Sequence, residues 1–207
     1  MNKIVEKYLA ADRELIAPVQ HIAELPLVVK NAEGPYLISA ENKRYLDFTS
    51  GACTMSLGYG IKNDHEFGSF PFPYASGVNQ IEYAKKLTKK FPGGFLSQIA
   101  FSVCGSDTND AAIKFSRAYT GRQKIVTFEG DYHGTTFGAA SLTTLPGRLS
   151  NKFAPMVGEI YSVPFCDEYA DDGQIDAVIE KIKALDCNTI AGFIVEPIQG
   201  DMGMLPM

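Results

Sequence analysis

The pattern of apolar and polar residues changes along the chain. Apolar residues at intervals of three and four predict a helix over residues 2–16. Residues 27–48 instead alternate short apolar runs with two polar turns, which predicts a small antiparallel sheet. Residues 49–79 are rich in Gly, Ser, Pro and aromatic residues and show no period. A long segment without regular structure is typical of a functional loop.

Beyond residue 80 the pattern predicts strands that alternate with helices. The expected strands cover residues 99–103, 124–128, 159–163 and 191–195, and the expected helices cover residues 79–91, 107–119 and 175–185. This alternation is typical of a parallel sheet covered by helices. We therefore predict an α/β fold, with a β-rich lobe over residues 1–60 and a larger domain over residues 61–207.

Composition and charge narrow the classes of function. The 207 residues are 45% hydrophobic and 21% charged, which indicates a globular chain. The net charge of −5 argues against a nucleic-acid partner, because such proteins usually carry a basic surplus. We find no signal-peptide core and no run of about 20 apolar residues, so we expect a cytoplasmic protein without a membrane partner. The four cysteines lack a CxxC pair, so we expect reduced thiols buried as small apolar groups.

The first candidate site lies at residues 103–110, between a predicted strand and a predicted helix. Gly105 allows a ligand to approach the backbone, and Ser106 lies where the N–H groups and dipole of a helix start suit a phosphate. Simple helix capping is the alternative, because Ser and Asp are preferred capping residues. The carboxylates of Asp107 and Asp110 would repel a phosphate if they pointed toward it.

The second candidate site follows the predicted strand that ends at Phe128. Loops at the carboxyl ends of parallel strands line the ligand crevice. Tyr132 offers a ring for stacking, and His133 offers an imidazole for hydrogen bonding. The alternative is a packed aromatic side chain next to a histidine with satisfied hydrogen bonds, and two residues alone favour that alternative. We expect no metal site, because the sequence has no HxxxH motif or Cys/His cluster.

The third candidate site is the segment from Val195 to Gly203, at the end of a fully apolar strand. Burial of a carboxylate is costly unless a cation or strong donors satisfy it, which makes Glu196 a functional candidate. A carboxylate that caps nearby N–H groups is an equally good explanation. The sequence has neither a GxSxG motif nor a GxGxxG motif after a strand, which argues against a serine hydrolase and a dinucleotide fold.

Together and in this order, these segments resemble the class III (subgroup II) pyridoxal-phosphate-dependent aminotransferases. The resemblance rests on CGSDTNDAAIKFSRAYTGRQKIVTFEGDYHGTTFGAAS, on FIVEPIQGDMG, and on RYLDFTSGACTMSLGYG, which is similar to the family's substrate-entry segment. It runs from about Leu27 onward. It implies a fold type I transferase whose three-layer αβα large domain is incomplete in residues 61–207, and a homodimer.

The resemblance also implies pyridoxal 5′-phosphate as the cofactor. Gly105 and Ser106 are then expected to bind its phosphate, and Tyr132 to stack on its pyridine ring. His133 is expected to support that loop, and Glu196 to lie close to the cofactor and the substrate.

The implied substrates are an amino donor, such as 4-aminobutyrate, ornithine or diaminobutyrate, and a 2-oxo acid acceptor. Ser50, Gly51 and Cys53 are expected to line the substrate entry. Asp201 stands where relatives often carry a second acid. Cys104 stands where the family more often has serine, which is a mild departure.

The Schiff-base lysine and the aspartate that pairs with the pyridine nitrogen lie downstream of EPIQG in this family, and the chain stops at Met207. We therefore expect no catalytic lysine in these 207 residues, and expect the full-length protein but not this fragment to transfer an amino group. Truncation is also expected to leave parallel strands unpaired. Two alternatives are a non-catalytic fragment acting as an interaction module, and a phosphate-ligand binding domain that uses the helix start at Gly105.

Overall fold

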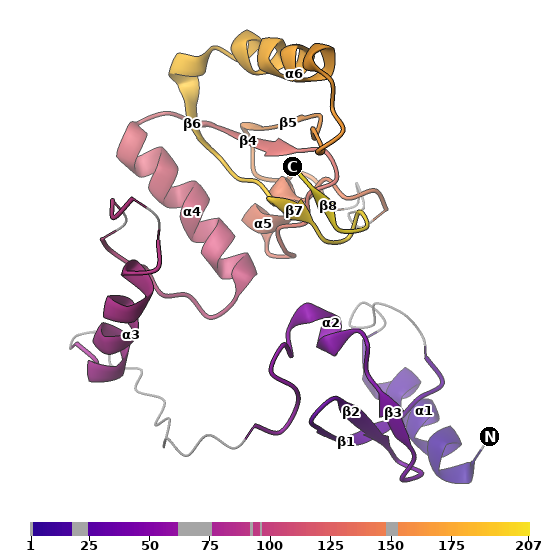
Figure 1. The fold of residues 1–207 in the computed structure, drawn as a ribbon. Coiled ribbons are helices and arrows are strands. Elements are labelled where there is room, and N and C mark those ends of the chain that lie inside the picture. Colours follow the sequence, from indigo (N-terminus) through magenta and orange to yellow (C-terminus); the bar gives the residue numbers. More distant parts are fainter. Residues whose placement is uncertain (1, 18–24, 62–75, 92, 96, 148–152) are drawn as a thin grey trace. The chain divides into compact units, whose positions relative to one another are not determined.

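The computed structural model describes the chain in two compact units, Met1–Gly77 and Val78–Met207 (Figure 1). The described residues are 2–17, 25–61, 76–91, 93–95, 97–147 and 153–207. The middle of the loop predicted over residues 49–79 lies outside them. The predicted division after residue 60 stays a prediction.

The first unit consists of a helix and a small antiparallel sheet. Its elements are α1 (Lys3–Leu15), β1 (Val29–Glu33), β2 (Tyr36–Ser39), β3 (Arg44–Leu46) and the single turn α2 (Ser50–Cys53). The strands lie in the order β1–β2–β3, and both pairs are antiparallel. The guanidinium of Arg44 lies 4.1 Å from the centre of the Tyr36 ring on the neighbouring strand. The predicted helix and antiparallel sheet are confirmed.

The turn α2 has a left-handed backbone. The φ angles of Ser50, Gly51, Ala52 and Cys53 are 51°, 59°, 57° and 63°. A left-handed helical conformation costs a non-glycine residue about 1–2 kcal/mol, because its Cβ approaches the following carbonyl oxygen. Three of these four residues are not glycine, so the conformation is unfavourable for them and contacts outside the turn must stabilise it.

The carboxylate of Asp47 supplies those contacts. Its Oδ1 accepts hydrogen bonds from the Thr49 N–H at 2.8 Å and the Thr49 hydroxyl at 2.6 Å. Its Oδ2 accepts from the Gly51 N–H at 2.9 Å and the Tyr59 hydroxyl at 2.6 Å. The bonds from the Thr49 and Tyr59 hydroxyls, followed by that from Gly51, hold the pKa of Asp47 well below its usual range. The ionised carboxylate therefore stabilises the left-handed turn.

The second unit contains a parallel sheet with helices on both sides. Its elements are α3 (Val78–Thr88), α4 (Gly105–Thr120), β4 (Lys124–Phe128), α5 (Phe137–Leu142), β5 (Ile160–Val163), α6 (Asp172–Ala184), the short 3-10 helix η3 (Cys187–Thr189), β6 (Ile190–Phe193), β7 (Ile198–Gln199) and β8 (Leu205–Pro206). The strand order is β5–β4–β6, and both pairs are parallel. The predicted parallel sheet is confirmed. The sequence did not predict α5 or the small β7–β8 hairpin.

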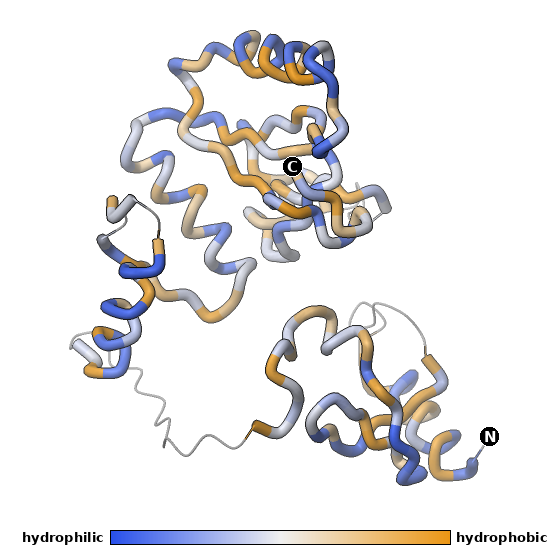
Figure 2. The backbone as a smooth tube through the Cα atoms, viewed as in Figure 1, coloured by the Kyte–Doolittle hydropathy of each residue, from blue (hydrophilic) through white to orange (hydrophobic). Residues whose placement is uncertain are grey.

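The central strand β4 sends alternate side chains into two cores. Ile125 packs with Ile113 of α4 and with Leu142 of α5. Val126 points to the other face and packs with Val163 of β5 and Val178 of α6, among others. Ile125 and Val126 are both fully buried, and the helices on the two sides alternate between hydrophobic and hydrophilic residues (Figure 2). The unit is therefore a three-layer arrangement with the sheet in the middle.

Two sequence expectations are wrong. Residues 99–103 form no strand, because pairing needs a neighbour and the described part of the chain offers none. Within this segment, Phe101 is 48% and Val103 is 93% exposed. The cysteines are also not buried as expected: all four are free thiols, three of them are exposed and Cys166 is half-buried. Cys53, Cys104 and Cys187 lie at the ends of short or long helices, whereas Cys166 packs against the core formed by Val126, Val163 and Val178.

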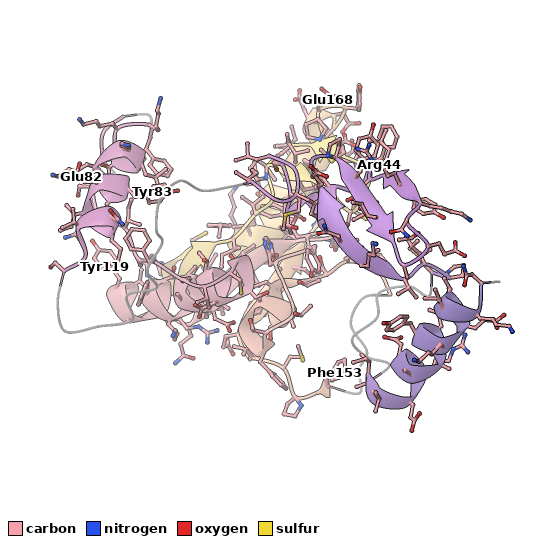
Figure 3. The ribbon with its side chains drawn as sticks, turned by 90° about the horizontal axis from the view of Figure 1, so that it is seen from below. Arg44, Glu82, Tyr83, Tyr119, Phe153 and Glu168 are labelled. Atoms are coloured by element: carbon pink, nitrogen blue, oxygen red, sulfur yellow. The ribbon has the colours of Figure 1, made fainter. Side chains whose placement is uncertain are left out.

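Apolar side chains also remain on the outer surface of α4. Phe115 is 57% exposed and Tyr119, which projects from the end of the helix in Figure 3, is 93% exposed. The two residues are four positions apart and therefore lie on one helix face.

Among the helices of the described residues, none is both long and apolar enough to cross a membrane.

The left-handed turn predicts an unusual sign for an alanine-to-glycine substitution. Ala52→Gly relieves the steric cost of a positive φ and is expected to raise the free energy of unfolding by about 0.5–1 kcal/mol. Ala10→Gly, on an exposed position of α1 in the same unit, is the matched control and is expected to lower it by about 1 kcal/mol. Urea unfolding measures both changes. Destabilisation by both substitutions would contradict the left-handed assignment.

The lowered pKa of Asp47 predicts acid sensitivity of the first unit. The unfolded carboxyl group takes up a proton near pH 4, at about its reference pKa of 3.9, while the folded group stays ionised to lower pH. The stabilisation is thus complete above the unfolded pKa and is lost as the pH falls through the folded pKa. Urea unfolding followed from about pH 5 to about pH 3 should show the beginning of this loss. The Asp47→Asn variant should show a shallower dependence, and an unchanged slope would contradict the role of Asp47.

Candidate functional site

The N-terminus of α4 contacts the loop that follows β4. Cys104 is the N-cap residue of α4, and its side chain makes no capping hydrogen bond. Ser106 does not cap the helix either, because its Oγ accepts a hydrogen bond from the Thr135 N–H at 3.2 Å. A Cβ atom on Gly134 would lie 2.1 Å from the same Oγ, and Gly134 has a φ of +127°. Only glycine therefore allows the loop to approach Ser106 so closely.

The start of α4 has room for a ligand. A Cβ atom on Gly105 would meet no heavy atom within 4 Å, so the space beside the first helical turn is open. The first N–H groups of a helix have no partner within the helix. The bond from Thr135 uses a lone pair of the Ser106 oxygen, so the hydroxyl keeps its own proton to donate. The helix start therefore fits an anion such as a phosphate.

The two nearby carboxylates that would repel an anion are occupied by N–H groups. Asp107 Oδ2 accepts a hydrogen bond from the Val103 N–H at 3.2 Å. Asp110 Oδ1 accepts from the Ala139 N–H at 2.8 Å, at the start of α5. The helix dipole and the open space beside Gly105 are thus not opposed by an acid that points at them.

Glu196 joins the segment after β6 to the loop after β4. Its Oε2 accepts a hydrogen bond from the Tyr132 N–H at 2.7 Å, and its Oε1 accepts from the Gly200 N–H at 3.4 Å. These contacts match the alternative that the sequence left open, a carboxylate that caps nearby N–H groups. Tyr132 is 37% exposed, so its ring is not enclosed in the core. The Glu196 carboxylate thus contacts the backbone of a residue whose side chain is partly exposed.

His133 ties the same loop to its surroundings. Its ring Nε2 lies 3.1 Å from Asp131 Oδ2, and its side chain is buried. Its N–H donates to Thr143 Oγ1 at 3.0 Å, and its carbonyl oxygen accepts from Asn109 Nδ2 of α4 at 2.7 Å. This is the histidine with satisfied hydrogen bonds that the sequence offered as an alternative. The structure shows its ring buried against Asp131.

Asp131 is at the centre of a buried hydrogen-bond network. It is fully buried, and its Oδ2 accepts from the Thr127 hydroxyl at 3.4 Å as well as lying beside His133. Its Oδ1 accepts from Gln199 Nε2 at 2.8 Å. We call Asp131, Thr127, His133 and Gln199 the Asp131 network. Asp131 and Gln199 have no predicted role, because they are 68 positions apart in the sequence. The available signal was a polar residue shortly after each apolar strand.

The remaining predicted residues lie elsewhere. Asp201 is exposed in the turn between β7 and β8. Ser50, Gly51 and Cys53 lie together in the turn α2 of the first unit. The five predicted cofactor residues therefore all lie in the second unit. The three predicted substrate-entry residues lie in the first unit. Within the described ranges, no group of three or more His, Cys, Asp or Glu residues is placed to hold a metal ion.

Comparisons with known proteins identify the family. The class-III aminotransferase family matches residues 18–207. An isoleucine 2-epimerase from Lentilactobacillus buchneri is 30% identical over 86% of this chain and 44% of its own length. An acetylornithine aminotransferase from Streptococcus mutans is 29% identical over 100% of this chain and 48% of its own length. The chain thus spans about half the length of the curated relatives it matches.

The fold agrees with this family. The crystal structure of taurine:2-oxoglutarate aminotransferase from Bifidobacterium kashiwanohense, in complex with pyridoxal phosphate and glutamate, superposes with a TM-score of 0.84 at 23% identity. The match covers 100% of this chain and 51% of that one. The predicted fold type I architecture with a partial large domain is therefore confirmed. Because the family match extends over nearly the whole chain, this chain belongs to the class III aminotransferase family.

Proposed function

We propose that the protein transfers an amino group from an amine or amino acid to a 2-oxo acid, with pyridoxal 5′-phosphate as cofactor. The single observation that carries this proposal is the convergence of three segments: the start of α4, the loop at Tyr132 and the carboxylate of Glu196. Family membership supports the reaction type, and the related taurine:2-oxoglutarate aminotransferase structure contains the same cofactor. When bound, the cofactor supplies an aldehyde carbon and an electron-withdrawing ring.

The residues of this chain bind and orient that cofactor in the proposal. The open helix start at Gly105 and the hydroxyl of Ser106 hold the phosphate. The partly exposed ring of Tyr132 stacks on the pyridine ring, and His133 fixes the loop that carries it. Glu196, held by the Tyr132 N–H, presents a carboxylate beside the ring.

The substrates and the assembly are part of the proposal. We assign the substrate entry to Ser50, Gly51 and Cys53, and a second acid near the substrate to Asp201. The donor is of the 4-aminobutyrate, ornithine or diaminobutyrate type, and the acetylornithine aminotransferase among the relatives supports this class. The active form is a homodimer. The lysine that carries the cofactor is not among the residues assigned here, and the 207 residues alone are expected to be inactive.

A second candidate function is inversion of an amino-acid stereocentre. The similarity to an isoleucine 2-epimerase and to a leucine/methionine racemase from Thermococcus litoralis favours it. Both reactions remove the proton from the carbon that bears the amino group. They differ in the fate of the nitrogen, because an epimerase keeps it on the same carbon skeleton and needs no 2-oxo acid.

An assay of the complete protein separates the two functions. The protein is incubated with 4-aminobutyrate, ornithine, alanine or isoleucine, each with and without 2-oxoglutarate. A transaminase consumes the donor only when the acceptor is present, and forms glutamate. Inversion of L-isoleucine without the acceptor, in the absence of glutamate formation, would instead establish the epimerase. The 207-residue chain assayed in parallel is expected to show no turnover.

The phosphate subsite has its own prediction. Ser106→Ala removes a hydroxyl donor from the helix start and is expected to weaken binding of inorganic phosphate about tenfold or more, because a hydrogen bond to a charged group is worth about 1.5 kcal/mol or more. Isothermal titration calorimetry measures the change. Ser141→Ala, at a half-buried hydroxyl of α5 that bonds the Phe137 carbonyl oxygen and the Val157 N–H, is the control and should leave phosphate binding unchanged. Equal binding by the Ser106 variant and the wild type would remove Ser106 from the site.

A further inference from the structure

We propose that Asp131 and Gln199 are positioning residues for the ring-binding half of the cofactor site. They touch no ligand themselves and act through their neighbours Tyr132 and Glu196. The inference rests on the proposed function and deepens it, because it separates the residues that hold the ring from those that hold the phosphate. Its basis is a set of buried hydrogen bonds that join the segment after β6 to the loop after β4. These bonds have no role in the proposed reaction itself.

The side chain of Gln199 is the link between these loops. It is 1% exposed, and its Nε2 donates both to Asp131 Oδ1 at 2.8 Å and to the carbonyl oxygen of Glu129 at 2.9 Å. A side-chain amide has two N–H donors, so both are used. Gln199 thereby attaches the segment after β6 to the segment after β4 by two bonds in a buried setting, where leaving a partner unsatisfied is costly.

The backbone at Gly130 is shaped to admit this side chain. Gly130 has a φ of +94°, and a Cβ atom there would lie 2.8 Å from Gln199 Oε1 and 2.9 Å from Met202 Cγ. No other residue type therefore fits beside Gln199 without moving it. The close approach and the buried bonds are two independent signs that the position of Gln199 is tightly specified.

The sequence positions connect this link to the ring site. Asp131 is buried, and the next residue, Tyr132, is partly exposed, so the anchored carboxylate fixes the backbone from which the Tyr132 ring projects. Gln199 follows Glu196 by three residues in the same short segment, which the bond from the Gly200 N–H to Glu196 closes. Besides these buried bonds, Glu196 and Tyr132 share one bond of 2.7 Å that solvent reaches. The buried bonds therefore set the separation of the ring from the carboxylate.

The phosphate subsite is held by different contacts. Ser106 is fixed by the Thr135 N–H, and His133 is joined to α4 by Asn109. Neither of these bonds involves Gln199. Loss of the Gln199 link is therefore expected to weaken recognition of a ring but not of a phosphate alone, which a general loss of structure does not produce.

The test uses two ligands that differ in the ring. 4-Deoxypyridoxine 5′-phosphate carries the phosphate and the pyridine ring but no aldehyde, so it does not react with surface lysines. Inorganic phosphate carries only the anion. Gln199→Met keeps the side-chain length and removes both donors. It is expected to weaken binding of 4-deoxypyridoxine 5′-phosphate about tenfold, the effect of a lost buried hydrogen bond, and to leave the dissociation constant of inorganic phosphate unchanged. Asp131→Asn, which turns one acceptor into a donor, should act in the same direction.

Lys124→Met is the matched control. It also removes a hydrogen bond from a side chain to a backbone carbonyl, from Lys124 Nζ to the Leu185 oxygen at 2.6 Å, but at the opposite end of β4. It should leave binding of both ligands unchanged. Equal loss of both ligands in the Gln199 variant, or no loss of either, overturns the positioning role. Absence of binding of 4-deoxypyridoxine 5′-phosphate by the wild type instead overturns the proposed cofactor site itself.

A measurement on the wild type decides the matter if the variants do not fold. The Tyr132 amide, bonded to Glu196, should exchange its hydrogen more slowly when 4-deoxypyridoxine 5′-phosphate is bound, and inorganic phosphate should have no such effect. The Gln199 side-chain amide should be protected already in the unliganded protein. Rapid exchange of that amide in the unliganded protein would show that the link is not formed and would overturn the inference.

Discussion

A carboxylate without solvent access is the constraint on which the candidate site depends. Asp131 is fully buried between the sheet and the loops above it, and a buried carboxyl group is tolerated only when hydrogen-bond partners surround it. The donors come from β4 itself, from the loop after it and from Gln199 beyond β6. The hydrogen bonds of this one side chain therefore bring together segments that are distant in sequence. They also fix the positions of the neighbouring exposed residues Tyr132 and Glu196.

The sheet supplies the frame for that arrangement. Because β4 is the central strand and buries both of its faces, its carboxyl end is held from both sides by helices. The loops after β4 and β6 leave neighbouring strands at the same edge, as parallel pairing requires. At this edge the loops are anchored in the core. In the proposed site, the phosphate would be held by α4 and the ring by the loops.

Regular elements were predictable from sequence wherever local pattern and burial agree. The strand Lys124–Phe128 and the helix that ends at Gly121 follow from apolar periodicity and from a glycine with a left-handed backbone. Residues 99–103 have the same apolar character but no strand beside them, so periodicity alone gave the wrong answer. The short helix α5 was missed because six residues give too few turns to show a period. In the site, Tyr132 and Glu196 were recognisable from their places after strands, whereas the pairing of Asp131 with Gln199 depends on tertiary contact that no local window contains.

The contrast between Gly134 and Gly105 gives directed libraries a starting plan. At Gly134 the chain has no spare volume, since even a methyl group would overlap the Ser106 hydroxyl. A larger residue at position 134 or 106 would push the loop away from the helix. Most variants with such a substitution are therefore expected to misfold. At Gly105 the neighbourhood is empty, so a larger side chain there would contact a bound anion before it contacts the rest of the protein. Diversity aimed at anion size or shape therefore belongs at residue 105, with 106 and 134 left untouched.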